Sequence, residues 1–401
     1  MSSKLISILQ FTRISPLFVG ETPYYGYQGR VWQLIMFSER KKKDILEIRR
    51  DELVSWLADR EIAAYRADQI LKWIYLRQAD GFDVMTDLSK DIRSALSQQF
   101  TIGRLDVEQV ETSRDGSVKY LFKLHDGKRI ESVLIPERDH YTLCVSSQVG
   151  CAQDCRFCLT AAGGFERNLS RGEIVAQVRD IKKDLDDEKR LTNIVFMGMG
   201  EPLANYKNLV SAISILTDND VGLRFASRRV TVSTAGLISK IIALGQDTRV
   251  NLAVSLNASD DKTRTRLMPI NRKYPLEKLM QACRQYLPAP GRRITFEYIL
   301  IKGINDSTED AERLAKLLRP IRCKVNLIPF NPHEGCDFKR PAETVIQAFY
   351  DILFAKNYTV IIRRSKGQDI SAACGQLRAR SVGEGAKQRA KGRGQGASGR
   401  G

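Results

Sequence analysis

The sequence predicts an α/β protein: a parallel sheet curved into a partial (β/α)6 barrel, preceded by a small accessory domain of helices and short strands. From residue 141 onward, six runs of β-branched and aliphatic residues alternate with segments of helical periodicity. Before residue 139, three amphipathic segments are followed by three strand-like runs. Strand–helix–strand repeats take right-handed crossovers, so the six strands should lie in one sheet. In such folds the chemistry lies at the C-terminal ends of the strands.

The expected elements can be placed along the chain. Barrel strands are expected at residues 141–146, 191–197, 229–233, 250–255, 293–301 and 324–328. Helices are expected at about 171–183, 206–216, 237–244, 275–286, 307–318 and 341–356, the last followed by a strand at 358–363. In the accessory domain, helices should begin near a capping Asp51, at about residue 65, and after Ser89. Strands should follow at 105–111, 118–124 and 129–135, with Asp126-Gly127 as a two-residue hairpin turn.

Composition divides the chain into four parts. Residues 1–43 form an N-terminal extension of uncertain role, and residues 44–138 the accessory domain. Residues 139–379 form the core, and residues 380–401 a Gly/Arg-rich tail that is expected to be disordered. The accessory helices carry basic residues, which fits either a module that docks RNA or a helical cap with a solvated face.

The charge balance points to a polyanionic partner. The chain has 64 Lys and Arg against 47 Asp and Glu, a net charge of +17. Such an excess favours nucleic acid as the partner, although a very soluble protein without one would have the same balance. No apolar run reaches the roughly 18 residues that span a membrane. The cysteines are not spaced as a secreted disulfide framework, so we expect a cytoplasmic protein.

The most specific motif is Cys151-Ala-Gln-Asp-Cys155-Arg-Phe-Cys158. Three thiolates at this spacing suit a [4Fe–4S] cluster that lacks a fourth protein ligand, and the open iron can bind a substrate or cofactor. Two alternatives remain on spacing alone. Cys144 lies seven residues upstream and could complete a four-cysteine zinc site, or the match could be fortuitous.

Polar residues follow several of the predicted barrel strands. Gly198-Met-Gly200-Glu201-Pro follows the second strand, where glycines permit close approach of a ligand and a carboxylate can accept from an ammonium group. Later strands end in Ser233, in Ser255-Leu256-Asn257 and in Asn331. These could be turn residues, or together they could form a polar rim around one cofactor. Glu131 has apolar neighbours on both faces of its strand, which favours a sheet edge over a catalytic role.

The cysteine motif, with Phe157 before its last cysteine, resembles the signature of the radical S-adenosylmethionine (SAM) superfamily. The stretches around Cys144, Gly198–Pro202, 325–331 and 372–376 narrow the resemblance to bacterial adenine carbon-2 RNA methyltransferases, over about residues 44–377. That resemblance implies a radical-SAM partial barrel as the core. It also implies a [4Fe–4S] cluster and two SAM molecules per turnover.

The resemblance assigns roles to individual residues. Cys151, Cys155 and Cys158 match the cluster ligands. Cys374 matches a cysteine that is methylated and then joined to RNA, and Cys144 matches the cysteine that releases the product by forming a disulfide with it. Glu131 matches the proton acceptor, which replaces the edge-strand interpretation. SAM contacts match Gly200, Glu201, Ser233, Ser255, Leu256, Asn257 and Asn331.

One of these matches departs from the family. Asn257 stands where many relatives carry histidine, and its side chain still offers a donor and an acceptor, so we expect the SAM contact to survive. Among the other cysteines, Cys283 and Cys323 should pack in the core, and Cys336 has no assigned role.

The resemblance also names partners. It implies 23S rRNA as substrate, tRNA as a second substrate, an electron donor such as flavodoxin or ferredoxin, and a monomeric enzyme. Two other functions stay open: methylation of adenosine carbon 8, which gives antibiotic resistance, and a non-catalytic RNA-binding protein with a four-cysteine zinc site.

Overall fold

The computed structural model describes residues 42–286, 292–333 and 335–378. Nearly all of the N-terminal extension and the Gly/Arg-rich tail lie outside the described residues. Lys43 begins the compact unit that contains all the elements below. Within the described residues, no helix is both long and apolar enough to cross a membrane.

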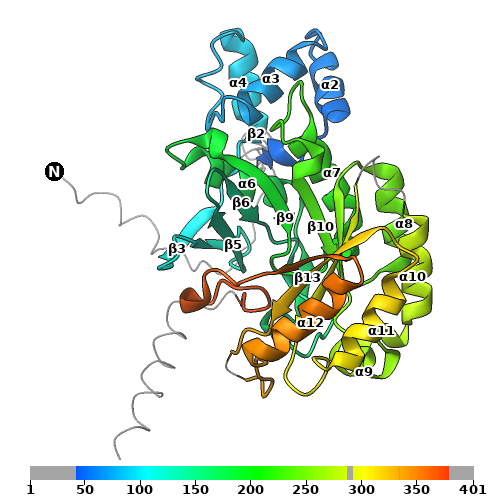
Figure 1. The fold of residues 1–401 in the computed structure, drawn as a ribbon. Helices are drawn as coiled ribbons and strands as arrows, with labels where there is room; N and C mark the ends of the chain where they lie inside the picture. Colours follow the sequence, from blue (N-terminus) through cyan, green and yellow to red (C-terminus); the bar gives the residue numbers. More distant parts are fainter. Residues whose placement is uncertain (1–41, 287–291, 334, 379–401) are drawn as a thin grey trace, which may run out of the picture. The chain divides into compact units, whose positions relative to one another are not determined.

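The accessory helices are α2 (Arg50–Ala58), α3 (Arg66–Tyr75) and α4 (Lys90–Gln99), seen in blue and cyan in Figure 1. Two short parallel strands, β1 (Lys43–Asp44) and β2 (Phe100–Thr101), bring the two ends of this helical segment together. Ser89 caps α4 as predicted, since its hydroxyl accepts from the amide of Ile92. The prediction for Asp51 is wrong, because the N-cap is Arg49, whose amide donates to the Glu52 carboxylate at 2.8 Å.

An antiparallel extension leads from the accessory helices into the main sheet. It consists of β3 (Asp106–Thr112), β4 (Val118–Lys123) and β5 (Arg129–Pro136). The β4–β5 loop differs from the predicted two-residue turn: Leu124 donates to the Lys128 carbonyl at 2.7 Å around three residues, and Gly127 takes a φ of +79°. Strand β5 lies between β4 and β6, so the interpretation of Glu131 as an edge-strand residue is wrong.

The six predicted barrel strands are all present and parallel, in chain order across the sheet. They are β6 (Tyr141–Cys144), β9 (Leu191–Phe196), β10 (Val230–Thr234), β11 (Asn251–Ser255), β12 (Ile294–Leu300) and β13 (Cys323–Pro329), with β14 (Thr359–Ile362) added in parallel at the edge. The ten-stranded sheet runs from β14 to β3 without closing, which confirms the partial barrel.

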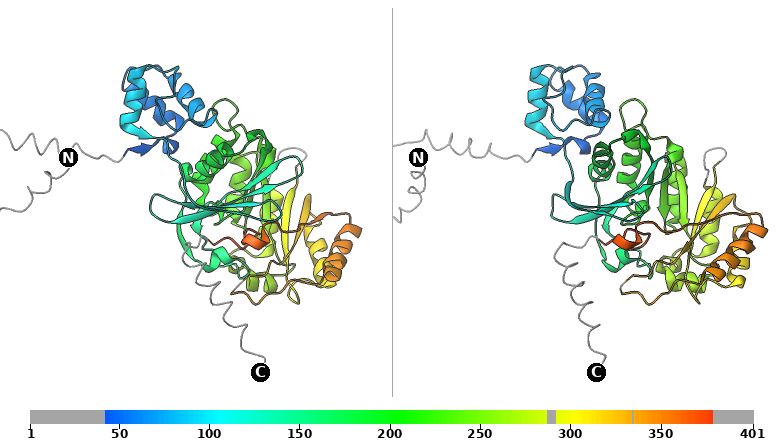
Figure 2. Two further views of the ribbon diagram at one scale, coloured as in Figure 1. Left: turned by 90° about the vertical axis from the view of Figure 1, so that its left-hand side faces the viewer. Right: turned by 60° about the vertical axis from the view of Figure 1, so that its left-hand side comes forward.

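The predicted core helices are also present. They are α6 (Arg171–Lys183), α7 (Tyr206–Thr217), α8 (Ile238–Asp247), α10 (Leu276–Gln285), α11 (Thr308–Leu318) and α12 (Glu343–Ala355). Neighbours in this series pack side by side along the sheet (Figure 1). Cys283 and Cys323 are buried in the resulting apolar core, as predicted. After β14 the chain returns across the sheet to β4 and β5, as Figure 2 shows in orange and red.

Candidate active site

The cysteine motif lies in a loop held by a two-stranded ribbon that the sequence did not reveal. Strands β7 (Gln148–Gly150) and β8 (Phe165–Asn168) are antiparallel, and the loop between them carries the motif and the short helix α5 (Leu159–Ala162). The Cys151 amide donates to the Gly164 carbonyl at 2.8 Å and closes the loop. Gly150 has a φ of +72°, and a Cβ there would lie 1.9 Å from the Gly164 oxygen, so this closure requires glycine.

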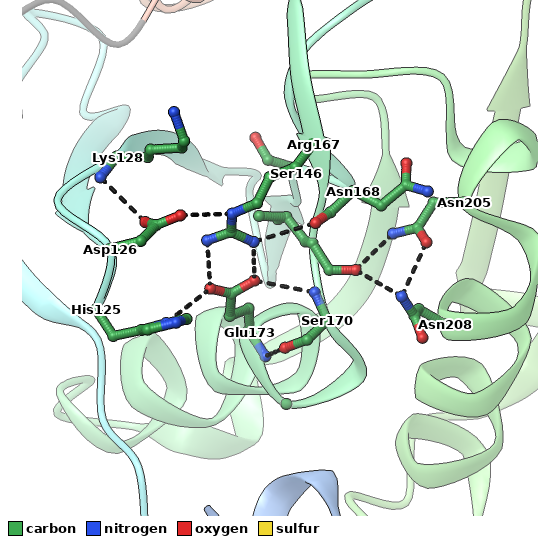
Figure 3. Close-up of polar contacts among 12 residues, drawn as sticks. His125, Asp126, Lys128, Ser146, Arg167, Asn168, Ser170, Glu173, Asn205 and Asn208 are labelled. Atoms are coloured by element: carbon green, nitrogen blue, oxygen red, sulfur yellow. Dashed lines mark hydrogen bonds and ion pairs between the residues drawn. The ribbon is translucent and has the colours of Figure 1, made fainter.

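A polar network holds β8 in place (Figure 3). Arg167 on β8 forms two hydrogen bonds of 2.8 Å to Glu173 in α6, and its Nε donates to Asp126 in the β4–β5 loop at 2.7 Å. Glu173 also accepts from the Ser170 amide, which completes the capping box of α6. The cluster loop is therefore tied to the accessory strands and to the first core helix.

The three motif cysteines are mutual electrostatic neighbours. Burial raises the pKa of Cys151 to about 12 and raises the pKa of Cys155 well above its ordinary value, with neighbouring thiols adding to both shifts. Within the described residues, no three His, Cys, Asp or Glu side chains are grouped to hold a metal ion. A four-iron cluster binds each thiolate at a different iron and so needs wider spacing than a single ion. Three thiols on one loop match the donors of a [4Fe–4S] cluster whose fourth iron is open.

The Gly198–Pro202 stretch lies directly behind this loop. A Cβ on Gly200, which has a φ of +101°, would come within 2.5 Å of Gln148, so the backbones of the two segments are in close contact. Glu201 is buried, and its carboxylate accepts from the amides of Leu203 at 3.0 Å and Ala235 at 2.7 Å. Burial nevertheless raises the pKa of Glu201 to about 7. A cationic ligand beside it would stabilise the charged form.

The other predicted SAM contacts lie at the ends of neighbouring strands. Ser233 lies near the end of β10, and its hydroxyl donates to Glu297 on β12 at 3.3 Å. Leu256 is fully buried. Asn257 has a φ of +58°; its side-chain oxygen accepts from the Ile299 amide at 2.8 Å and its nitrogen contacts the Met268 sulfur at 3.3 Å. Much of the hydrogen-bonding capacity of Asn257 is thus used within the protein.

The loop after β14 docks Cys374 against the cluster loop. Leu159 donates to the Gly375 carbonyl at 2.7 Å, and the Thr160 hydroxyl donates to the Leu377 carbonyl at 2.6 Å. Asn331, beyond the end of β13, donates to the Cys374 carbonyl at 3.4 Å. The bonds of Leu159 and Thr160 bring residues more than 200 positions apart to the same edge of the sheet.

Cys144 and Cys374 are both free thiols in this region. After burial, Cys374 is the strongest influence that raises the pKa of Cys144. Cys374 is solvent-exposed, yet enough protein surrounds its thiol that desolvation raises its pKa as well. Cys144 is thus near Cys374, whereas the zinc alternative needs it beside the motif cysteines.

Glu131 faces the same region from β5. It is 5% exposed, its Oε1 lies 3.5 Å from Lys119 Nζ, and its Oε2 accepts from the Arg378 amide at 2.8 Å. Burial raises the pKa of Glu131, and the charge of Lys119 opposes that shift. The carboxylate is therefore held between a fixed cation and the segment that follows Cys374.

Two residues of the site were missed by sequence reasoning. Lys119 is buried and also contacts Glu111 at 2.8 Å and the Ile370 carbonyl at 2.6 Å. Glu297 is a buried carboxylate whose pKa is raised by burial, and it influences both Cys144 and Cys374. Each is a charged residue within a largely apolar strand, the same signal that drew attention to Glu131.

Comparisons with known proteins agree with this geometry. Residues 145–318 match the radical SAM superfamily, and residues 43–102 match the ribosomal RNA large subunit methyltransferase N-terminal domain. A "dual-specificity RNA methyltransferase RlmN" from Desulfosudis oleivorans is 56% identical over 356 residues, which cover 89% of this chain and 96% of the relative. A relative of the same name from Geobacter sulfurreducens is 53% identical, covering 84% of this chain and 92% of its own length.

A solved structure supports the same relationship. The crystal structure of a radical SAM methyltransferase from Sphaerobacter thermophilus superposes with a TM-score of 0.80 and 45% identity, covering 84% of this chain and 100% of that one. The protein therefore belongs to the RlmN family of radical SAM enzymes, and it methylates RNA using a [4Fe–4S] cluster and SAM as cofactors.

Proposed function

We propose that this enzyme methylates carbon 2 of one adenosine in 23S rRNA, at the peptidyl-transferase centre, and of the adenosine 3′ to the anticodon in tRNA. The observation that carries the proposal is the docking of Cys374 against the cluster loop, with a second free thiol, Cys144, nearby. The relatives' description as dual-specificity RNA methyltransferases supports two kinds of RNA substrate. The large-subunit family match supports rRNA as one of them.

Cys151, Cys155 and Cys158 would hold the cluster, with SAM beside its open iron. When bound, this group supplies a 5′-deoxyadenosyl radical. Glu201 faces this region as a buried carboxylate that would pair with the ammonium group of SAM. The backbones near Gly200 and the ends of β10, β11 and β13 would enclose the rest of the cofactor, through Ser233, Ser255, Leu256, Asn257 and Asn331.

Cys374 would carry the methyl group. Carbon 2 of adenine is electron-poor and cannot displace a methyl group from a sulfonium, whereas a thiolate can. Cys374 would therefore accept the methyl group from one SAM molecule. Loss of a hydrogen atom from that S-methyl group to the radical from the second SAM would let its carbon bond to carbon 2. Protein and RNA would then be joined through Cys374.

Glu131 and Cys144 would complete the reaction. Glu131 would take the carbon-2 proton from the joined species, a task that suits a buried carboxylate with a raised pKa. The joined species is a radical, so it would also give up one electron, which would return to the enzyme's redox group. Cys144, as thiolate, would then attack Cys374 Sγ. The bond between Cys374 and the methylene carbon breaks, its electron pair and a proton complete the methyl group, and a Cys144–Cys374 disulfide remains to be reduced.

The accessory domain, residues 44–138, would dock the RNA. Its helices present cations stacked on aromatic rings: Arg60 lies 4.1 Å from the Trp56 ring centroid and Arg77 lies 4.0 Å from that of Trp73. The tryptophan rings are half-buried and the arginines exposed, so the guanidinium groups are available to contact phosphates and to stack on bases. The net charge of +17 also favours binding of polyanionic RNA. We further propose that the enzyme works as a cytoplasmic monomer and takes electrons from a flavodoxin or ferredoxin.

Product analysis tests the proposal. The anaerobically reconstituted enzyme would be incubated with SAM, a reductant and either protein-free 23S rRNA or tRNA. The digested nucleosides would be separated by liquid chromatography against 2-methyladenosine and 8-methyladenosine standards and detected by mass spectrometry, because the two isomers have the same mass. We expect 2-methyladenosine from both RNAs. An 8-methyladenosine product would establish the carbon-8 alternative instead, and a product from rRNA alone would remove tRNA from the proposal.

A further inference from the structure

A fully buried guanidinium lies behind the cysteine loop without a carboxylate partner. Arg264 is on α9 (Asp261–Leu267), a helix that the sequence did not reveal, and it is 0% exposed. None of the ion pairs formed by the described residues includes it. A buried cation normally requires a negative partner, since desolvating a lone charge costs several kcal/mol. Arg264 forms no direct ion pair; Asp261 acts on it and is linked to it through the Asn271 side chain, which accepts from Arg264 at 2.9 Å and donates to Asp261 at 2.8 Å.

The hydrogen bonds of Arg264 gather the ends of two neighbouring strands. Its Nη2 donates to the Ala235 carbonyl at 2.8 Å, just after β10, and to the Ser255 carbonyl at 3.3 Å, the last residue of β11. Its Nε donates to the Leu256 carbonyl at 3.1 Å, and its Nη1 to the Asn271 side chain at 2.9 Å. All four acceptors are uncharged.

Ala235 connects Arg264 to Glu201. The amide of Ala235 donates to the Glu201 carboxylate at 2.7 Å, while its carbonyl accepts from Arg264 at 2.8 Å. A displacement of the guanidinium would therefore move the amide that orients the Glu201 carboxylate. It would also move the carbonyl groups of Ser255 and Leu256, two of the positions assigned to SAM.

The cysteine loop approaches Arg264 from the side of Ala235 and Leu267. Cys155 packs against the small apolar cluster that includes Ala235 and Leu267. The Arg156 amide donates to the Leu267 carbonyl at 2.9 Å and joins the cysteine loop to the end of α9. As a thiolate, Cys155 would act more strongly on the charge of Arg264 than Asp261 or Cys283 does. A [4Fe–4S] cluster held by three thiolates is an anion, and reduction adds one more negative charge.

We propose that Arg264 is a positioning residue that joins the two cofactor sites: it fixes the strand ends that cradle SAM, and it supplies the buried positive charge opposite the cluster. The proposal rests on the assignment of Cys155 as a cluster ligand. A buried cation near a redox group stabilises its reduced form and raises the reduction potential, because little water screens the interaction. Arg264 would thus favour the electron transfer that starts each turnover.

The test compares two fully buried arginines in the reconstituted holoenzyme. Arg264→Gln removes the charge beside the cluster, and Arg179→Gln removes a matched arginine of α6 that donates to the Ala79 and Gly103 carbonyls and pairs with Asp80. The cluster potential would be measured by redox titration with electron paramagnetic resonance, and SAM affinity by equilibrium dialysis. For Arg264→Gln we expect at least a tenfold less favourable reduction, about 59 mV more negative for one electron, and at least tenfold weaker SAM binding.

Each outcome decides the proposal. An unchanged potential in Arg264→Gln overturns the electrostatic role, and so does an equal shift in Arg179→Gln. If Arg264→Gln does not fold, Arg264→Lys decides: it should keep the potential and weaken SAM binding, and wild-type affinity would overturn the role in the SAM cradle. The underlying site is tested separately by Cys155→Ala. If that variant retains the full iron and sulfide content, the cluster assignment fails, whatever Arg264 does.

Discussion

The cluster loop and the Cys374 loop meet at one edge of the sheet, but they are held there in different ways. The cluster loop is closed by its own ribbon, within about 20 residues of chain, through contacts such as Cys151 to Gly164. The Cys374 loop is positioned by partners far away in sequence, including Leu159, Thr160 and Asn331. Chemistry that depends on the first loop alone should therefore survive damage to the second, whereas the reverse should not hold.

The difference is sharpest when one cysteine is removed from each loop. Cys155→Ala should lose iron, SAM cleavage and RNA methylation together. Cys374→Ala should keep its iron and still form 5′-deoxyadenosine, while RNA methylation falls on the order of 10³-fold or more, because the methyl carrier is gone. Iron and sulfide content, 5′-deoxyadenosine yield and methylated nucleoside would be measured on the same samples. Loss of the cluster in Cys374→Ala would show that the two loops are not separable.

The next largest effect concerns the release of product. Cys144→Ala should accumulate a covalent protein–RNA adduct and fall by roughly 10²-fold or more in turnover, since no thiol remains to attack Cys374. Denaturing gels with labelled RNA would detect the adduct. Cys283→Ala is the matched control, because Cys283 is an equally buried thiol in the apolar core, away from Cys374. If Cys144→Ala turns over normally without an adduct, the proposed resolving role is wrong.

Glu131 lies where the two loops and the accessory strands meet, and its proposed role predicts a pH effect. Burial raises the pKa of Glu131 and the charge of Lys119 lowers it. Loss of the Lys119 charge in Lys119→Met should therefore raise the pKa of Glu131 further. A general base works only when ionised, so the acidic limb of the rate profile should move to higher pH, with about a tenfold loss per pH unit below it.

The conservative variant separates charge from packing in this experiment. Lys119→Arg keeps a cation and should keep the acidic limb close to that of the wild type. The measurement is single-turnover methylation of RNA across pH, with cluster content checked at each point. An acidic limb that stays in place in Lys119→Met would exclude Glu131 as the group that titrates.

Local sequence signals located the cysteine motif but neither the ribbon that closes its loop nor the docking of Cys374. The three-cysteine spacing, the strand runs and the Ser89 cap are encoded over a few residues, and each could be predicted. The β7–β8 ribbon could not, because its strands are only three and four residues long and include a glycine at positive φ. The contact between the Cys374 loop and the cluster loop could not be predicted from local sequence either. Only a family resemblance linked Cys374 with Cys144.

The same reasoning explains which charged site residues escaped detection. Lys119 and Glu131 meet because β4 and β5 pair in a particular register, and Arg264 matters because α9 places it behind the strand ends. Neither register nor helix placement is visible in composition or spacing. The hydrogen bonds that Asn257 makes to Ile299 and Met268 were likewise not visible in the sequence.

The smallest predicted effect tests the docking of the Cys374 loop itself. Gly375 has a φ of +81°, and an added Cβ would lie 3.3 Å from the Phe157 carbonyl oxygen of the cluster loop. Gly375→Ala should therefore destabilise the docked conformation by about 1–2 kcal/mol, the usual penalty for a side chain in the left-handed region. Hydrogen exchange should become faster at the Leu159 amide, which donates to the Gly375 carbonyl, while methylation slows by roughly tenfold.

Gly127→Ala is a matched control, because that glycine has a similar φ of +79° with no atom within 4 Å of the added Cβ. If both variants methylate RNA equally well, the contact between the loops contributes little, and the loops are held together by the remaining bonds of Thr160 and Asn331.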